Sequence, residues 1–293
     1  MQFNRERQGE FFIILQATLW SLFPVITIMT YGTLTPLFSL AWSTFFAVIF
    51  FAGVMSAKKQ WHEIKNFQAL KDILGATLFI GIGYYALYFL GLKYTSPGNA
   101  IIIAKIETLF SFLFFHVWKK NSIPSTHIIG SALMLVGALI VLYPNTTSLN
   151  RGDVFVLLAA SIAPFGNFFQ QRARKKVRSE TIMFIRSVVS APVIFFLGIL
   201  YQPQSFSLNI SASLLFLIVN GFLFMGLSKI FWLEGIHRIS VTKANALSTI
   251  APFLTLVFAW LFLANQPTLW QIVSLIPITV GLILIGINKE GRL

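Results

Sequence analysis

The sequence contains no cysteine and few charged residues, and both shortages narrow the class of protein. Without cysteine, a disulfide framework and a thiolate metal site are excluded. Charged residues occupy 11% of the 293 positions, whereas a soluble domain carries about 25%. Hydrophobic residues reach 56%. This balance predicts an integral membrane protein.

Acidic residues are the scarcest charged group, with nine Asp and Glu against 22 Lys and Arg and a net charge of +13. A basic excess of this kind also occurs in nucleic-acid-binding proteins. Here, however, the basic residues lie mainly in short segments between apolar runs, as in residues 172–178. We therefore expect a lipid bilayer with anionic headgroups as the partner of this charge, and no nucleic acid.

Apolar runs long enough to cross a bilayer recur along the whole chain. A crossing needs about 20 helical residues, and each run is far longer than the about 10 alternating residues of a barrel strand. The sequence therefore predicts an all-α fold of ten transmembrane helices, at residues 11–31, 34–55, 72–92, 97–118, 125–143, 153–171, 180–200, 211–234, 240–263 and 268–287.

Lysine and arginine are distributed unevenly between the two sides of these helices. With the N-terminus inside, the inner segments hold 17 of them and the outer connections hold two, Lys93 and Arg151; the other three lie within spans. Such an excess marks the cytoplasmic side. We therefore expect a multi-pass protein of the cytoplasmic (inner) membrane, with a cytoplasmic N-terminus at residues 1–10 and a cytoplasmic C-terminus at residues 288–293.

The chain repeats itself at a distance of 144 residues. Residues 91–96 (Gly-Leu-Lys-Tyr-Thr-Ser), followed by Ala100, correspond to residues 235–240 (Gly-Ile-His-Arg-Ile-Ser), followed by Ala244. Because each half holds five predicted helices, the second half must enter the membrane from the opposite side. The sequence therefore predicts two inverted five-helix repeats, residues 11–143 and 153–287, with a polar site near the midplane where they meet.

Several motifs resemble those of the EamA-type permeases of the drug/metabolite transporter superfamily. They are Leu19-Trp20-Ser21, residues 91–96 with Asn99-Ala100, and Ala251-Pro252-Phe253 with residues 259–263 (Ala-Trp-Leu-Phe-Leu). The resemblance covers essentially the whole chain and implies a ten-helix export carrier with a central cavity. One departure is Thr108, which follows Glu107 where family members often carry proline.

Two charges lie near the middle of the predicted helix 97–118. Lys105 and Glu107 fall about 12 and about 15 Å from its start, where each charge costs on the order of 3 kcal/mol. In a continuous helix their side chains point about 200° apart. For Lys105, the alternatives are an anchor for an anionic substrate group and a structural ion pair with a neighbouring helix. For Glu107, they are a proton carrier and a fixed salt bridge or helix–helix hydrogen bond.

Further candidates come from the second half and from its correspondence to the first. Arg186 and Lys229 lie about five or six residues from cytoplasmic helix ends, where extension of the side chain to the headgroups is the structural alternative. A cationic, aromatic pocket suits amphipathic or aromatic metabolites, although ordinary packing also explains single aromatic residues. The predicted substrate-binding residues are Lys105, Trp20, Tyr85, Tyr88, Lys229, Trp232, Asn245 and Thr249, with Glu107 and Arg186 as coupling or structural charges.

The predicted function is a secondary transporter that exports small metabolites, such as amino acids or related amphipathic and aromatic compounds, by alternating access. The alternatives are an integral-membrane enzyme or lipid-handling protein with a midplane polar site, and a structural scaffold. The glycines of residues 81–83 (Gly-Ile-Gly) lie inside an apolar span, where they favour close helix packing over nucleotide binding. The four histidines lack metal-ligand spacing. We expect no catalytic residue, metal or cofactor, and a monomer or homodimer.

Overall fold

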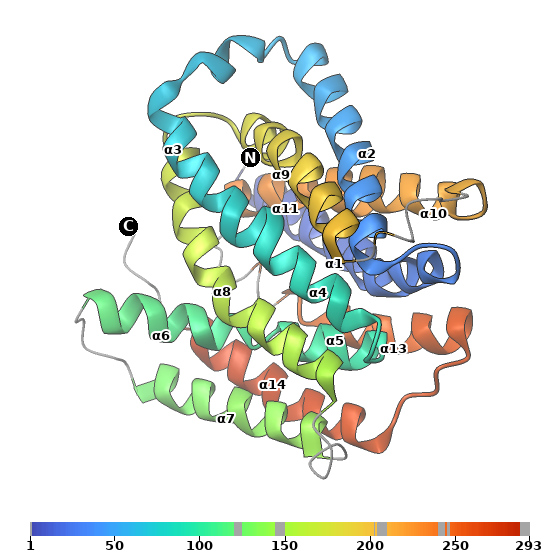
Figure 1. Cartoon of the computed structure of the whole chain (residues 1–293). Coiled ribbons are helices and arrows are strands. Elements are labelled where there is room, and N and C mark those ends of the chain that lie inside the picture. Colours follow the sequence, from blue (N-terminus) through green and yellow to red (C-terminus); the bar gives the residue numbers. More distant parts are fainter. Residues whose placement is uncertain are drawn as a thin grey trace.

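The computed structural model describes residues 2–119, 125–143, 150–201, 203, 210–239, 244 and 247–287. Within these residues all regular secondary structure is helical, and there is no strand (Figure 1). The predicted all-α class is therefore confirmed.

Among the residues that the structure describes, seven helical segments are long and apolar enough to cross a membrane. They are α1 (Gln2–Met29), α2 (Pro36–Ala57), the run of α3 (Phe67–Ala76), η3 (Thr77–Tyr84) and α4 (Tyr85–Leu92), α7 (Ser125–Leu142), α8 (Arg151–Arg174), α9 (Ser179–Tyr201), and the run of η6 (Ile210–Ser213), α10 (Leu214–Val219), η7 (Asn220–Leu227) and α11 (Ser228–Arg238). The remaining helices are α5 (Pro97–Ala104), α6 (Glu107–Lys119), α13 (Ile250–Leu263) and α14 (Leu269–Ile287). Because α1 begins at Gln2, the polar residues 2–10 form its first turns.

Local sequence sets the start of two helices that contribute to the site. The Ser96 side chain accepts a hydrogen bond from the backbone N–H of Asn99 at 3.1 Å, and Pro97 occupies the first position of α5. Proline is favourable there because its missing N–H would have had no partner within the helix. The Asn150 side chain caps α8 in the same manner by accepting from the N–H of Gly152 at 2.9 Å.

Two of the long segments contain π-helical turns at corresponding places. η3 and η7 each span eight residues, and their first members, Thr77 and Asn220, lie 143 positions apart. Such turns are frequent at functional sites. A Cβ atom on Gly83 would lie 2.9 Å from Ile162 of α8. The close packing predicted for the glycines of residues 81–83 is therefore confirmed.

The predicted helix 97–118 is broken, and the continuous helix expected from the sequence is wrong. Lys105 and Ile106 separate α5 from α6. Their N–H groups donate to carbonyl groups three residues back, at 3.1 and 3.0 Å, which is the tight turn that often ends an α-helix. A similar turn precedes α13, where the N–H of Ala251 donates to the carbonyl of Ser248 at 3.1 Å. The break forms even though Thr108 replaces the proline.

The two halves of the chain pack against each other throughout the bundle (Figure 1). α1 lies against α11 and α13, α2 lies against α9 and η7, and α3 and α4 lie against α8. α7 and α14 run side by side along the lower edge of the view. A large cluster of buried apolar side chains joins helices of both halves, so the polar residues described below are held in a packed interior.

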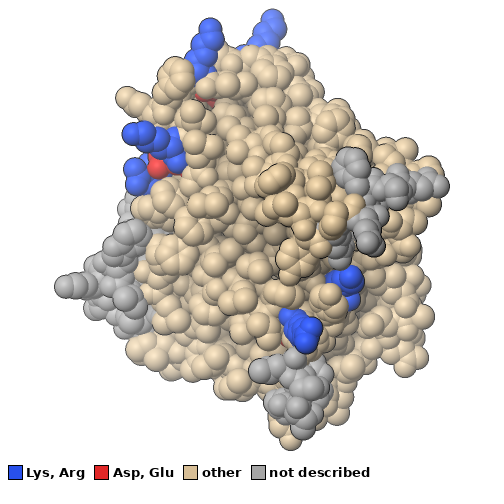
Figure 2. Space-filling model, viewed as in Figure 1, with Lys and Arg blue, Asp and Glu red and all other residues tan. Residues whose placement is uncertain are grey.

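Charged side chains collect at one end of the bundle, which we call the charged end: residues 58–66 and 175–178 with the adjoining helix ends. Figure 2 shows blue and red groups at the upper edge of the molecule, above a broad surface without charge, and two separate blue groups lower on the right. Carboxylates at the charged end join the two halves of the chain. The ion pairs are Lys58–Glu180 at 2.5 Å, Asp72 with Lys176 at 2.9 Å and with Arg172 at 3.2 Å, and Glu63–Arg178 at 3.5 Å.

Candidate functional site

The break between α5 and α6 places Lys105 against the second half of the chain. Its Nζ atom donates to both the carbonyl oxygen and the Oγ atom of Ser248, each at 3.3 Å. Ser248 and Thr249 form the turn before α13, so the helix breaks of the two halves meet here. The Ser248 carbonyl, which already accepts from the N–H of Ala251, thereby accepts a second hydrogen bond from the ammonium group. The partner is uncharged, unlike that of the ion pair considered for Lys105.

Glu107 is the first residue of α6, and Lys105 directly follows α5. A helix N-terminus favours a negative charge and a C-terminus favours a positive one, so the break stabilises both. Glu107 Oε1 accepts a hydrogen bond from Asn167 Nδ2 of α8 at 2.6 Å, which is the helix–helix bond considered as one alternative. Glu107 also lies close enough to Lys105 and Lys229 for electrostatic attraction.

Two further basic residues flank Tyr85. The ammonium group of Lys229 lies 3.6 Å from the ring centroid of Trp20. The Arg186 guanidinium lies 5.9 Å from the Tyr85 ring and donates to Gln170 Oε1 at 3.3 Å. Tyr85 lies near both basic groups. Arg186 is only 5% exposed, so its side chain stays inside the bundle and does not extend toward headgroups.

Aromatic rings form a continuous series beside these charges. The Trp20 ring stacks on Phe23 with centroids 4.6 Å apart, Phe23 stacks on Tyr88 at 5.9 Å, and Tyr88 stacks on Tyr84 at 5.8 Å. Stacked rings offer large apolar faces, while tyrosine and tryptophan add a polar edge. The series therefore gives the interior an amphipathic wall that runs from α1 to η3 and α4.

We call Lys105, Glu107, Arg186 and Lys229 the central charges. In the described part of the chain none of them has an opposite charge within 4 Å. Lys105, Glu107 and Lys229 lie deep among protein atoms and yet retain accessible surface. These side chains therefore lie in the interior of the bundle, where each keeps some surface free of protein contact. The same described residues hold no group of three or more His, Asp or Glu side chains that could bind a metal ion.

Not every predicted residue joins this group. Trp232 packs instead with Ile13, Ile239 and Ala244, in a separate cluster. Thr249 is half-buried in the turn beside Ser248. Asn245 lies outside the described residues.

The sequence analysis missed Asn167 and Gln170, which bind Glu107 and Arg186. Both lie on α8 at a spacing of three residues, which places them on one helix face. A pair of amide side chains at this spacing inside an apolar, phenylalanine-rich span is a visible signal. Polar residues in such a position usually face the bundle interior.

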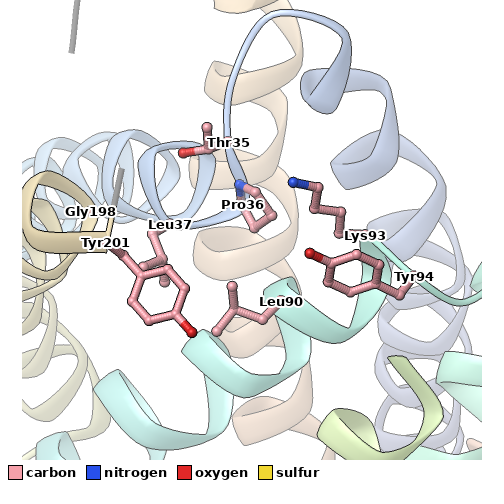
Figure 3. A pocket seen from close by; sticks show the side chains of 8 residues that line it. All are labelled: Thr35, Pro36, Leu37, Leu90, Lys93, Tyr94, Gly198 and Tyr201. Carbon is pink, nitrogen blue, oxygen red and sulfur yellow. The ribbon is translucent and has the colours of Figure 1, made fainter. Parts of the chain in front are cut away.

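A shallow pocket lies away from the central charges, where α2 begins and α4 and α9 end. It encloses about 310 Å³, including space open to its surroundings. Figure 3 shows the Lys93 side chain reaching past the Tyr94 ring toward Pro36. The lining residues are Thr35, Pro36, Leu37, Leu90, Lys93, Tyr94, Gly198 and Tyr201. None of them belongs to the predicted site.

Long apolar helices around an internal set of charges define a multi-pass membrane protein. The sequence profile of the EamA-like transporter family matches residues 7–143 and again residues 150–287. The chain therefore belongs to the EamA-like transporter family, a family of membrane transporters within the drug/metabolite transporter superfamily. The resemblance stated from the sequence motifs is confirmed.

Individual relatives are distant. The chain is similar to the uncharacterized transporter sll1164 of Synechocystis sp., with 22% identity over 69% of this chain and 61% of the relative, so it spans less than two thirds of that protein. It is similar to the uncharacterized transporter YyaM of Bacillus subtilis, with 23% identity over 87% of this chain and 85% of the relative. A solved crystal structure matches with a TM-score of 0.69 over 97% of this chain and 96% of the other, at 18% identity, which shows a shared fold.

Proposed function

We propose that this protein is a secondary carrier that exports small metabolites, such as amino acids or related amphipathic and aromatic compounds, by alternating access. The contact between the two helix breaks, made by Lys105 and Ser248, carries the proposal. In carriers built from inverted repeats, interrupted helices form the substrate site near the midplane, because their free ends offer unpaired backbone groups and dipole charge.

We further propose that ten helices form two inverted five-helix repeats. Three observations support this arrangement. They are the π-helical turns of η3 and η7, the facing helix breaks, and the match of each half of the chain to the same family profile. The proposed substrate contacts are Lys105, Lys229, Trp20, Tyr85, Tyr88, Asn245 and Thr249. Trp232 would join them in another state of the carrier. Glu107 would carry a coupling proton. Arg186 would either bind the substrate or stabilise the packing of the bundle interior.

The ion pairs of the charged end support a state that is closed on that side. In the proposed cycle these pairs separate when the opposite end closes, so that the central charges face one side of the membrane at a time. The excess of Lys and Arg assigns the charged end and both termini to the cytoplasm. Exposed Arg174 and Lys175 would there contact anionic lipid headgroups.

The function is tested with purified protein in sealed proteoliposomes. The solutes to assay are those that accumulate in cells lacking the chain and decline in cells that overproduce it. We expect Lys105→Met to reduce their flux, whereas Lys71→Met, which changes an exposed lysine of α3, should not. Conversion of a solute by the detergent-solubilised protein, without flux across sealed vesicles, would instead identify a membrane enzyme.

Orientation is tested by cysteine labelling, which is convenient because the native chain has no cysteine. On intact cells, an impermeant thiol reagent should label the variant Thr33→Cys and leave Lys175→Cys unlabelled until the membrane is opened. Labelling of Lys175→Cys on intact cells would overturn the proposed orientation.

A further inference from the structure

The charges inside the bundle are unbalanced. Three of the central charges are basic and one is acidic, and none of the four forms an ion pair within the described residues. Charges in a membrane interior are normally paired or face water. Glu107 can offset only one of the three basic groups, and its Oε1 already accepts a hydrogen bond from Asn167. Basic groups therefore outnumber acidic groups by three to one among the central charges.

The two basic groups near Tyr85 are held by weak partners. Lys229 rests on the face of the Trp20 ring, and Arg186 is bound by a neutral amide, Gln170. Lys229 and Arg186 also lie close enough to repel each other. A carboxylate would be a stronger partner for each, because charge-assisted hydrogen bonds are about twice as strong as neutral ones.

We propose that the substrate of this carrier is an organic anion, in which a carboxylate or a similar acidic group is attached to an apolar or aromatic body. The acidic group binds between Lys229 and Arg186 beside the hydroxyl group of Tyr85, and the body lies against the partly exposed Trp20 ring, where the aromatic series begins. This inference rests on the proposed carrier function and adds the charge of the substrate to it.

The geometry disfavours the other two charge classes. A cationic substrate would meet three basic groups and a single carboxylate that already binds Asn167. A neutral substrate would leave the like charges of Lys229 and Arg186 uncompensated. An anion lowers this repulsion and allows Lys229 to leave the indole ring. Arg186 adds a planar fork of donors that matches a carboxylate.

The first test measures binding of three probes of nearly the same size to the full-length protein in detergent: phenylacetate, phenylacetamide and phenethylammonium. Isothermal titration calorimetry gives the affinities. We expect phenylacetate to bind at least about tenfold more tightly than either of the others, because one additional charged contact in a buried site has an effect of this order. Equal or tighter binding of the neutral or cationic probe overturns the proposal, and so does the absence of phenylacetate binding.

Variants then locate the anion. Lys229→Met and Arg186→Gln should each weaken phenylacetate binding by about tenfold to a hundredfold, with little effect on phenylacetamide. Lys71→Met serves as the matched control, and Lys229→Arg should retain most of the affinity, which separates loss of charge from loss of fold. Unchanged phenylacetate binding in folded Lys229→Met and Arg186→Gln overturns the assigned position.

Flux measurements in sealed vesicles separate this inference from the carrier function on which it rests. Transport of phenylacetate in preference to the other probes supports both. Transport of phenylacetamide or phenethylammonium in preference to phenylacetate leaves the carrier function intact and overturns the anion assignment. Selective binding of phenylacetate, with no flux of any probe or cellular solute, supports the anion site and contradicts the carrier.

Discussion

The charged end and the central charges hold ionised groups in different ways. At the charged end, Asp72 binds both Lys176 and Arg172, and Glu180 binds Lys58. Inside the bundle, Lys105 binds a carbonyl and a hydroxyl group, and Lys229 lies on an aromatic ring. Each of these carboxylates at the charged end is neutralised by a basic side chain of the protein. The central charges are stabilised by helix ends, amides and rings, and none of them has an opposite charge within 4 Å in the described residues.

This difference separates two roles for charge in one protein. Ion pairs between the halves stabilise one arrangement of the bundle, and salt in the surrounding solution screens them when they are exposed. Salt screens charges inside the membrane much less. Removing one of the central charges should therefore change substrate binding or flux more than it changes the free energy of unfolding. Substitutions in the two regions should therefore have different readouts.

The largest effect is expected for Glu107→Gln, which removes the acidic member of the central charges. The amide keeps the shape and can still accept the hydrogen bond from Asn167, so the protein should fold. Without a titrating group at this position, accumulation driven by a pH gradient should fall to background, while exchange of substrate across the membrane continues. Flux assays with and without a pH gradient check both parts. Normal gradient-driven transport by this variant would exclude Glu107 as the proton carrier.

The second-largest effect is expected for a substitution at the charged end. Asp72→Asn removes the carboxylate that binds Lys176 and Arg172, while both basic groups stay partly exposed and can be hydrated. We expect the free energy of unfolding to fall by about 2 kcal/mol, as for hydrogen bonds to charged groups. Denaturation in detergent measures the change, with Lys71→Gln on the same helix as the control. Phenylacetate affinity should stay within about twofold. An equal loss in the control would show that the change does not report on the ion pairs.

A smaller effect on flux is expected for Lys105→Met, which removes the ammonium group but keeps an apolar stem. The Ser248 carbonyl retains its bond from Ala251, so the fold should persist, while substrate flux falls about tenfold because one charge-assisted contact is lost. Proteoliposome flux, normalised to folded protein, provides the measurement. Full flux in this variant would show that Lys105 only supports the helix break.

The smallest effect is expected for Lys58→Met. Lys58 is 42% exposed and pairs with Glu180 at the charged end, and exposed pairs contribute about 0.2–1 kcal/mol. The loss of stability should disappear in high salt, because the wild-type pair is then screened as well. A loss that is independent of salt would indicate a packing contribution of the Lys58 stem.

Much of this arrangement follows from sequence, and particular residues show where prediction ends. Hydropathy located the long helices, and the motifs around Trp20, Asn99 and Pro252 indicated the family. The helix break at Lys105 was not predicted, because no proline marks it and because helix ends that stabilise charges are seen only in three dimensions. The sequence placed Lys105 and Glu107 about 200° apart on one helix; across the break, Lys105 contacts Ser248 and Glu107 contacts Asn167 of α8.

Other gaps have equally physical causes. The α8 amides Asn167 and Gln170 were overlooked because charged and aromatic residues were weighed first, although the spacing of the two amides places them on one helix face. Trp232 was assigned to the site by its correspondence to Tyr88, but it packs with Ile13 in a separate cluster. Correspondence between repeats predicts the position along a helix better than the partner that a side chain meets.

The proposed alternating access requires the charged end to open during transport. It is tested most directly with the double variant Lys58→Cys/Glu180→Cys, since the chain has no other cysteine and these side chains meet at 2.5 Å. A short, reducible bis-methanethiosulfonate reagent should join the two positions, reduce flux to background and leave phenylacetate binding intact, and reduction should restore flux. Either single variant, treated in the same way, should keep its flux. Full transport by completely cross-linked protein would contradict alternating access through the charged end.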